Sequence, residues 1–167
     1  SLSAQDLKIV TDPTELVLDV EETAQISAKV VDANGEEVAG QQLLFYSRKG
    51  KAVEVDESGM VTAHMPGEHK IIILTPRPAT GKRLRIDYPV KVNFPPISEI
   101  IVSEVPAKVY AGTIFPLEVL VMDKMGLERE DINVEVSSSD PSVAHVDPYM
   151  NVKAEKAGQA TLTVSYE

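Results

Sequence analysis

Residues Ser137–Asp147 read SSSDPSVAHVD, and this stretch joins a turn signal to the start of an extended segment. We expect the serines to end one strand, Asp140-Pro141 to turn the chain, and residues 143–146 to begin the next strand, with another turn at Asp147. Serine and aspartate suit turns because their side-chain oxygens bond to nearby backbone groups. The stretch therefore predicts a loop and a strand, and it requires no chemistry of its polar residues.

Alternation of apolar and polar residues continues along the chain, whereas helical periodicity is nearly absent. Ile26, Ala28 and Val30 alternate with polar residues, as Leu162 and Val164 do with threonines. One apolar face and one wet face is the pattern of a half-buried strand. Turn signals stand at residues 32–35, 56–59, 66–67 and 157–158. Short strands punctuated about every ten residues predict an all-β sandwich or barrel.

The chain also matches itself when it is shifted by 91 residues, which is the sign of an internal repeat. Ungapped comparison of 54 pairs gives 10 identities, where average residue frequencies give about 3 by chance. The matching positions are Val30/Val121, Asp32/Asp123, Gly35/Gly126, Glu37/Glu128, Ser47/Ser138, Val55/Val146, Asp56/Asp147, Val61/Val152, Ala63/Ala154 and Gly67/Gly158. They fall at turns and inward-facing strand positions, so the sequence predicts two tandem copies of one fold.

The boundary between the copies is expected at Phe94, Pro95 and Pro96, because two consecutive prolines make a stiff, extended linker. We place domain 1 at 1–96 and domain 2 at 97–167.

A family resemblance rests on three segments of domain 2: Ser137–Asp147, Val152-Lys153-Ala154 and residues 157–164, which read AGQATLTV. Together they resemble the pattern of bacterial Ig-like group 2 (BIG2) domains, and domain 1 resembles a divergent copy that keeps residues 55–63. The resemblance implies two tandem immunoglobulin-like β-sandwich domains of surface or secreted proteins, including adhesins of the intimin and invasin type. Met150-Asn151 stands where the pattern has a glycine, so the tight turn there is expected to differ.

Domain 2 is predicted to lack its final strand. In domain 1 a strand over residues 70–74 is followed by a last strand at roughly 83–94, and the shifted position of that last strand lies beyond Glu167. Either the fragment is cut short, which we favour, or another segment supplies the strand. An unpaired edge of this kind invites β-augmentation by a partner or a second copy.

Composition excludes several classes of function. The formal net charge of −10 and the pI of about 4.8 argue against general nucleic-acid binding and against adsorption to anionic lipid. The absence of cysteine rules out disulfides, thiolate metal sites and a cysteine nucleophile. No phosphate-binding loop, GxSxG or HExxH motif is present, so we expect no enzymatic activity, no catalytic residues and no cofactor.

Three polar groups contain residue types that could bind a metal, but their patterns favour solvated turns or loops. His64 and His69 flank Pro66-Gly67 with Glu68 between them, and two histidines beside a carboxylate could hold zinc. Residues 32–35 resemble the start of a calcium loop without its terminal glutamate. The acidic group Glu128, Glu130 and Asp131 is interrupted by Arg129. We therefore expect no metal site, although a calcium- or carbohydrate-binding module remains an alternative.

A basic surface on domain 1 is the candidate interaction patch. Its members are Arg77, Lys82, Arg83, Arg85, Arg48, Lys49 and Lys51. Domain 1 carries a net charge of −3 and domain 2 a net charge of −7. The patch either deters edge pairing, which we favour, or contacts a neighbouring domain or an anionic polymer.

The sequence thus predicts non-catalytic structural or interaction modules of a larger exported protein, in an extracellular, cell-surface or periplasmic location. The expected partners are other domains of the same polypeptide, or a surface protein or glycan, but neither nucleic acid nor an inserted membrane. A second interpretation is that of accessory domains which dock or orient the catalytic domain of a secreted enzyme.

Overall fold

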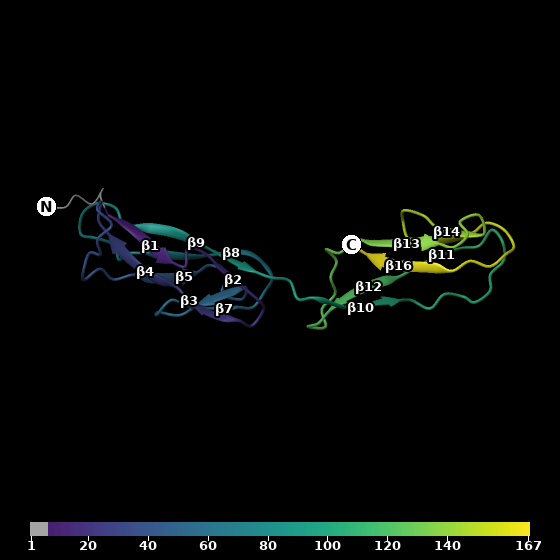
Figure 1. The fold of residues 1–167 in the computed structure, drawn as a ribbon, viewed down its shortest axis with the longest axis horizontal. Helices are drawn as coiled ribbons and strands as arrows, with labels where there is room; N and C mark the ends of the chain where they lie inside the picture. The colour runs from purple at the N-terminus through teal and green to yellow at the C-terminus, as the bar shows by residue number, and fades with distance from the viewer. Residues whose placement is uncertain (1–6) are drawn as a thin grey trace. The chain divides into compact units, whose positions relative to one another are not determined.

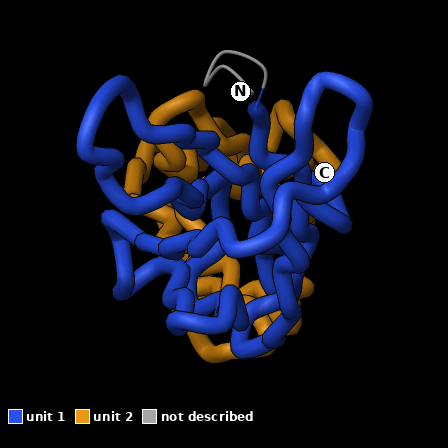
Figure 2. The backbone as a smooth tube through the Cα atoms, turned by 90° about the vertical axis from the view of Figure 1, so that its left-hand side faces the viewer, with its two compact units in different colours: residues 1–95 blue, residues 96–167 orange. Residues whose placement is uncertain are grey.

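The computed structural model describes residues 7–167, which form strands, turns and bends and contain no helix (Figure 1). No helix in this described part has the length and apolar character needed to cross a membrane. The chain divides into two compact units, Ser1–Pro95 and Pro96–Glu167, called unit 1 and unit 2 below (Figure 2).

Unit 1 is built from three sheets. Its strands are β1 (Lys8–Asp12), β2 (Leu16–Leu18), β3 (Thr23–Gln25), β4 (Ser27–Val31), β5 (Leu44–Ser47), β6 (Val53–Val55), β7 (Met60–Ala63), β8 (Gly67–Leu74) and β9 (Arg85–Val92). The largest sheet has the order β2-β9-β8-β5, and the others are β1-β4 and β3-β7-β6. All neighbours are antiparallel except β2 and β9, which run parallel.

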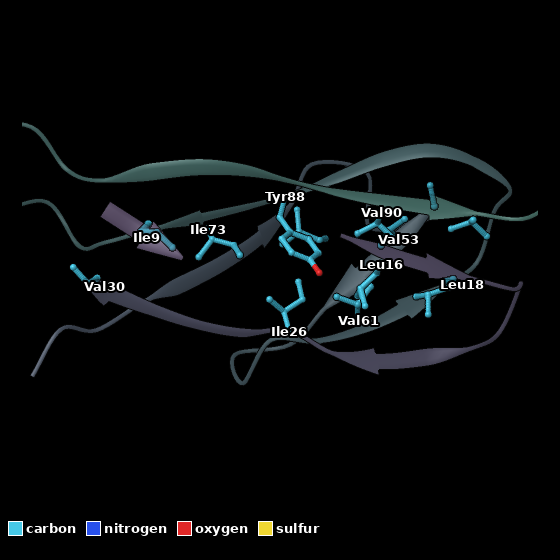
Figure 3. Close-up of a cluster of buried hydrophobic side chains, with 14 residues drawn as sticks. Ile9, Leu16, Leu18, Ile26, Val30, Val53, Val61, Ile73, Tyr88 and Val90 are labelled. Atoms are coloured by element: carbon cyan, nitrogen blue, oxygen red, sulfur yellow. The ribbon is translucent and has the colours of Figure 1, made fainter. Parts of the chain in front are cut away.

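The core of unit 1 forms where the inward faces of these sheets meet (Figure 3). Strand β9 shows why: Tyr88, Val90 and Val92 are at most 1% exposed, while Pro89 and Lys91 between them face solvent. Period-two alternation therefore puts a complete apolar row on one face of the strand. The buried members of the cluster are Ile9, Leu16, Leu18, Ile26, Val30, Ala52, Val53, Val61, Ala63, Ile71, Ile73, Tyr88, Val90 and Val92.

Tyr88 combines this burial with a specific hydrogen bond. Its hydroxyl donates to the backbone oxygen of Pro13 at 2.9 Å. Burial, with smaller effects from Glu15 and Asp12, raises the pKa of Tyr88 to about 12. A buried tyrosine whose hydroxyl has found a partner anchors the segment before β2 to the centre of the unit.

Unit 2 repeats the pairings of unit 1. Its strands are β10 (Ile97–Val102), β11 (Ile114–Pro116), β12 (Val119–Asp123), β13 (Val134–Ser138), β14 (Ala144–Val146), β15 (Asn151–Ala154) and β16 (Leu162–Tyr166). The pairs β10-β12, β11-β15, β14-β15 and β13-β16 correspond to β1-β4, β3-β7, β6-β7 and β5-β8. The register is that of unit 1 with 91 added, except that a bulge between Ile97 and Glu99 shifts the first pair of β10 and β12. The predicted fold class, all-β with two tandem immunoglobulin-like sandwiches, is confirmed.

Two strands of unit 1 have no counterpart among the described residues of unit 2. Residues 107–109 correspond to β2 but do not form a strand, and no described strand corresponds to β9. Strand β16, which corresponds to β8, is therefore paired with β13 alone.

The tight turn of unit 2 is present, contrary to the expectation from its missing glycine. Met150 takes the place of Gly59 and adopts the same left-handed backbone, with φ of 63° against 88°. A β-carbon on Gly59 would lie 3.0 Å from the ring of Phe45, whereas Val136 stands at the corresponding position in unit 2. The smaller valine leaves space for a side chain at position 150, so the turn survives at some backbone cost.

Candidate functional site

The predicted basic patch is distributed over two loops at opposite ends of β5. Arg77, Lys82 and Arg83 lie in the connection between β8 and β9, which begins beside Leu44 because Leu44 opposes Leu74. Arg48, Lys49 and Lys51 lie in the loop that follows Ser47 at the other end of the strand. The two sets therefore form separate surfaces, and each has to be considered by itself.

Arg48 and Lys49 line a hollow of about 450 Å³ that β8 completes. Glu68, His69 and Lys70 contribute from β8, and Ser47, Val53 and Ile72 form the rest of the lining. The antiparallel register explains why these residues meet. Ser47 opposes Ile71, so Arg48, which follows Ser47, lies at the level of Lys70, which precedes Ile71. We call this set the cationic hollow; the sequence does not place its members Lys70 and His69 in the basic patch.

Arg85 and Lys70 share one carboxylate. Asp87 accepts from Lys70 Nζ at 3.1 Å and from Arg85 Nη2 at 3.1 Å. Lys70 and then Arg85 hold the pKa of Asp87 below its usual value. All three side chains are largely exposed, so the ion pairs add little to stability. They do partly neutralise the positive charge of Arg85 through Asp87.

His64 and His69, the two candidate zinc ligands, have different hydrogen-bonding partners. His64 places Nε2 3.2 Å from Glu54 Oε2 and Nδ1 3.4 Å from Glu21 Oε1. The hydrogen bond with Glu54, followed by that with Glu21, raises the pKa of His64. His69 instead places Nε2 2.8 Å from the backbone oxygen of Met65. Within residues 7–167, no group of three or more His, Cys, Asp or Glu side chains is arranged to hold a metal.

The pair formed by His64 and Glu54 recurs in unit 2 with its members exchanged. Glu155 corresponds to His64 and His145 to Glu54, and His145 Nδ1 lies 3.8 Å from Glu155 Oε1. The same two places of the fold thus carry one histidine and one carboxylate in either order, which is the behaviour of a surface cross-strand pair.

The aspartates that could carry chemistry are used to close turns. Asp56 Oδ1 accepts from the amides of Ser58 at 2.8 Å and Met60 at 2.9 Å. Asp147 Oδ1, 91 residues later, accepts from the amides of Tyr149 and Asn151, both at 2.9 Å. The Ser58 hydroxyl is the main cause that holds the pKa of Asp56 low, and the Asn151 amide is the main cause for Asp147.

The loops that resemble calcium sites follow the same rule. Asp32 Oδ1 accepts from the amides of Asn34 and Glu36, and Asp123 Oδ1 accepts from those of Met125 and Leu127, at 2.8–3.1 Å. Each carboxylate thereby accepts hydrogen bonds from backbone amides that have no backbone acceptor in the turn.

In the acidic group of unit 2, Arg129 is buried to 9% exposure and binds Asp131 through two hydrogen bonds of 2.7 and 2.8 Å. This bidentate pair raises the pKa of Arg129 and lowers that of Asp131. A carboxylate held in this way is already paired with a cation. The group is therefore a fixed ion pair flanked by exposed glutamates.

The turn at the opening stretch of the sequence has the same construction. Asp140 Oδ1 accepts from the Ser142 amide at 3.0 Å and from its hydroxyl at 2.5 Å. Ser139 Oγ accepts from the Thr161 amide at 2.8 Å. The residues Ser137–Asp147 thus contain the end of β13, a turn and β14, as the sequence predicts.

Comparison with solved structures finds chains of similar fold. Domains 4 and 5 of the S-layer protein SbsC are 22% identical, with 97% of this chain and 92% of that chain covered at a TM-score of 0.44. The Yersinia pseudotuberculosis adhesin InvE is 18% identical over 99% of this chain and 59% of its own, also at 0.44. The first two extracellular repeats of human protocadherin-24 are 10% identical over 97% and 93%, at 0.40.

Neither a protein-family model nor a curated protein matches the chain.

Proposed function

We propose that the chain provides non-catalytic structural and interaction modules of a larger exported or cell-surface protein, of the BIG2 kind that its sequence resembles. Their work is to hold a stiff immunoglobulin-like scaffold and to present loops and strand edges to partners. The expected location is extracellular, on the cell surface or in the periplasm.

One observation carries this proposal: the polar side chains that would be needed for chemistry are committed to turns at equivalent places in both units. Asp32 and Asp123 close one turn, and Asp56 and Asp147 close another, each with its Oδ1 accepting two backbone amides. Side chains conserved between the two copies for turn geometry favour a scaffold over a reaction site.

The cationic hollow supports an interaction role for unit 1. Arg48 and Lys49 bring two positive charges to one hollow of an acidic protein, beside Lys70, which is paired with Asp87, and Glu68, which is the one carboxylate of the lining. Such a site is suited to an anionic partner, which is an acidic neighbouring domain or an anionic polysaccharide. This observation also supports the second candidate function, in which the modules dock against a catalytic domain of the same polypeptide.

Thermal unfolding with and without ligand tests the scaffold role. We expect the midpoints of the purified chain to stay the same in calcium chloride and in EDTA, since a ligand that binds only the folded state raises its stability. A midpoint that rises with calcium concentration would contradict the proposal and favour a calcium-binding module.

Binding to a heparin column, used as a model anionic polymer, tests the interaction role. We expect salt-sensitive retention that is lost in the double variant Arg48→Glu, Lys49→Glu and changed less by Arg85→Glu, because Asp87 already pairs with Arg85. The double variant Lys124→Glu, Lys156→Glu, at two exposed residues of unit 2, is the charge-matched control. Retention that is absent in the unaltered chain, or equal in all variants, would overturn the role of the hollow.

A further inference from the structure

The cationic hollow lies where unit 1 departs from the strand pairing of unit 2. In unit 2 the pairing continues past the end of β13, because the Ser139 amide donates to Thr161 O at 2.9 Å and Ser139 Oγ accepts from the Thr161 amide at 2.8 Å. Arg48 and Lys70 are the equivalent residues of unit 1, and within residues 7–167 no hydrogen bond joins their backbones. Pairing in unit 1 therefore ends one residue earlier, and the hollow opens at that point.

The backbone of Lys70 faces the hollow. Thr75 donates its amide to Leu84 O at 3.0 Å, so Thr75 directs its backbone groups toward the side of β9. Because these directions alternate along a strand, Ile71 and Ile73 also face β9, whereas Lys70 faces β5. The amide of Lys70 has no partner among residues 7–167. It is a hydrogen-bond donor that is free to bind a ligand in the hollow.

Two cationic side chains stand beside this amide. Arg48 and Lys49 are exposed, and neither side chain forms an ion pair or a hydrogen bond within the described part of the chain. The Lys70 ammonium, in contrast, is paired with Asp87 at 3.1 Å. A guanidinium, an ammonium and a backbone amide that converge on one place form a site for a single acid group.

The hollow also contains hydrogen-bond acceptors. Glu68 is the one carboxylate of the lining and is exposed. His69 places Nε2 2.8 Å from Met65 O, so this nitrogen donates, and Nδ1 of the neutral ring keeps its lone pair. Both groups are suited to accept from hydroxyl groups of a ligand.

Apolar side chains complete the lining. Val53 is 1% exposed and Ile72 is 7% exposed. The volume of about 450 Å³ lies within the range of about 300–1,000 Å³ that is usual for sites of small ligands. The hollow thus combines an apolar surface with donors for one acid group and acceptors for hydroxyl groups.

We propose that the cationic hollow binds an acidic sugar residue of a glycan, a hexuronic acid or a related carboxylated sugar. The sugar carboxylate accepts from Arg48, Lys49 and the Lys70 amide. The sugar hydroxyl groups donate to Glu68 and to Nδ1 of His69, and the ring lies over the apolar side chains. This inference rests on the interaction role proposed for unit 1 and names the partner of the same site.

The mixture of donors and acceptors favours a sugar over an acidic peptide. A uronic acid has one carboxylate and several hydroxyl groups on a single ring, and it therefore uses both the cations and the acceptors. An acidic peptide brings carboxylates without hydroxyl groups, and Glu68 repels them. A neutral sugar leaves Arg48 and Lys49 without an anionic partner.

Titration of the whole chain with a defined oligosaccharide tests the proposal. The probe is a trimer of galacturonic acid, the neutral control is the corresponding galactose trimer, and the acidic control is an oligoglutamate peptide. We expect saturable binding of the probe, with NMR shifts at the amides of Arg48, Lys49 and Lys70 and slower hydrogen exchange at Lys70. Both controls should bind at least about tenfold more weakly, because neither satisfies the charged and the hydroxyl-binding groups together.

Two matched variants test whether the hollow is the site. Arg48→Ser introduces the residue of unit 2, which bonds to the neighbouring strand, and should weaken the probe at least about tenfold through loss of the guanidinium. Arg77→Ser makes the same change at an exposed residue of the connection between β8 and β9, and it should leave binding unchanged. Both variants should keep the thermal midpoint of the unaltered chain, since both positions are exposed.

Removal of Glu68 separates the two kinds of anionic partner by the sign of its effect. Glu68→Ala removes a hydroxyl acceptor, so the galacturonate trimer should bind about threefold more weakly or worse. The same variant removes a repulsive charge and should strengthen the binding of oligoglutamate. Stronger binding of both ligands would contradict the role of Glu68 as an acceptor.

Three results would overturn the proposal: no saturable binding of the galacturonate trimer, equal binding of the galactose trimer, or equal loss of binding in Arg48→Ser and Arg77→Ser. Retention on heparin distinguishes this failure from failure of the proposed function. Salt-sensitive retention that depends on Arg48 and Lys49, without binding of the trimer, overturns only the sugar assignment. Loss of both overturns the interaction role as well.

Discussion

Units 1 and 2 pair their common strands in the same register, but they differ in how completely their cores are closed. Unit 1 buries Tyr88, Val90 and Val92 from β9 against Ile71 and Ile73. Unit 2 is the shorter unit, and yet it exposes more large apolar side chains. The turns and hairpins therefore define the fold in both units, and in unit 1 strand β9 adds a row of buried apolar side chains beside β8.

A second difference concerns one turn that both units keep. Gly59 adopts its left-handed backbone without strain, while Met150 must hold the same conformation with a β-carbon. The exchange of Phe45 for Val136 provides the space. Position 150 therefore tolerates a methionine in a left-handed backbone, because the residue that would contact its β-carbon is a valine in place of a phenylalanine.

Removal of the Tyr88 ring should cause the largest change in the stability of unit 1 relative to unit 2. Tyr88→Ala should lower the free energy of unfolding of unit 1 by about 3–5 kcal/mol, as expected for a large side chain removed from a core. Tyr88→Phe removes only the hydrogen bond to Pro13 and should cost about 1 kcal/mol. Urea unfolding checks both variants, and an effect on unit 2 equal to that on unit 1 would contradict independent cores.

A clash at Gly158 gives the next largest effect. A β-carbon there would lie 2.6 Å from Val143 Cγ2, whereas the counterpart of Val143 in unit 1 is Ala52. Gly158→Ala should destabilise unit 2 by about 1–3 kcal/mol through overpacking. Adding Val143→Ala should recover part of that loss. A double-mutant cycle measures the coupling, and additive effects would show that the two positions do not interact.

Exchange of the turn residues should produce smaller changes of opposite sign. Met150→Gly should stabilise unit 2 by up to about 1 kcal/mol, because glycine adopts the left-handed backbone without steric cost. Gly59→Ala should destabilise unit 1 by about 1–2 kcal/mol, since its β-carbon would lie 3.0 Å from Phe45 and from the Ile26 oxygen. Thermal unfolding of each variant checks the signs, and destabilisation by Met150→Gly would contradict this account.

The smallest expected effect is the pH dependence that His64 contributes. Glu54 and Glu21 raise the pKa of His64 above the ordinary value of 6.5. The stabilisation is therefore complete below pH 6.5 and is lost as the pH rises through the higher folded-state pKa. Unfolding midpoints of unit 1 across this interval should become less dependent on pH in His64→Gln and in Glu54→Gln. An unchanged slope in both variants would show that the cluster does not contribute.

The sequence predicts the parts of the fold that depend on local chemistry. Alternation identifies the strands, and the recurrence of Asp32 at Asp123 and of Asp56 at Asp147 identifies the repeated turns. The persistence of the turn at Met150 could not be predicted, because it depends on a contact between residues far apart in the chain. The parallel pairing of β2 with β9 could not be predicted for the same reason, because the two strands lie far apart in the chain.

The candidate site was predicted only in part for a similar reason. Composition identifies Arg48 and Lys49 as basic, but only the register of β5 with β8 places Lys70 beside them. The same register separates these residues from Arg77, Lys82 and Arg83. The role of the basic residues in binding stays a prediction.

Hydrogen exchange tests most directly the central claim that unit 2 repeats the strand pairings of unit 1, with β16 paired through β13 alone within residues 7–167. We expect the amides of Ile71 and Ile73, which β9 covers, to exchange only on global opening of unit 1. The amides of Leu162 and Val164 should exchange rapidly, while those of Thr163 and Ser165, which face β13, should be protected. Equal protection of Leu162, Thr163, Val164 and Ser165 in the monomeric chain would contradict the one-sided pairing of β16 within residues 7–167.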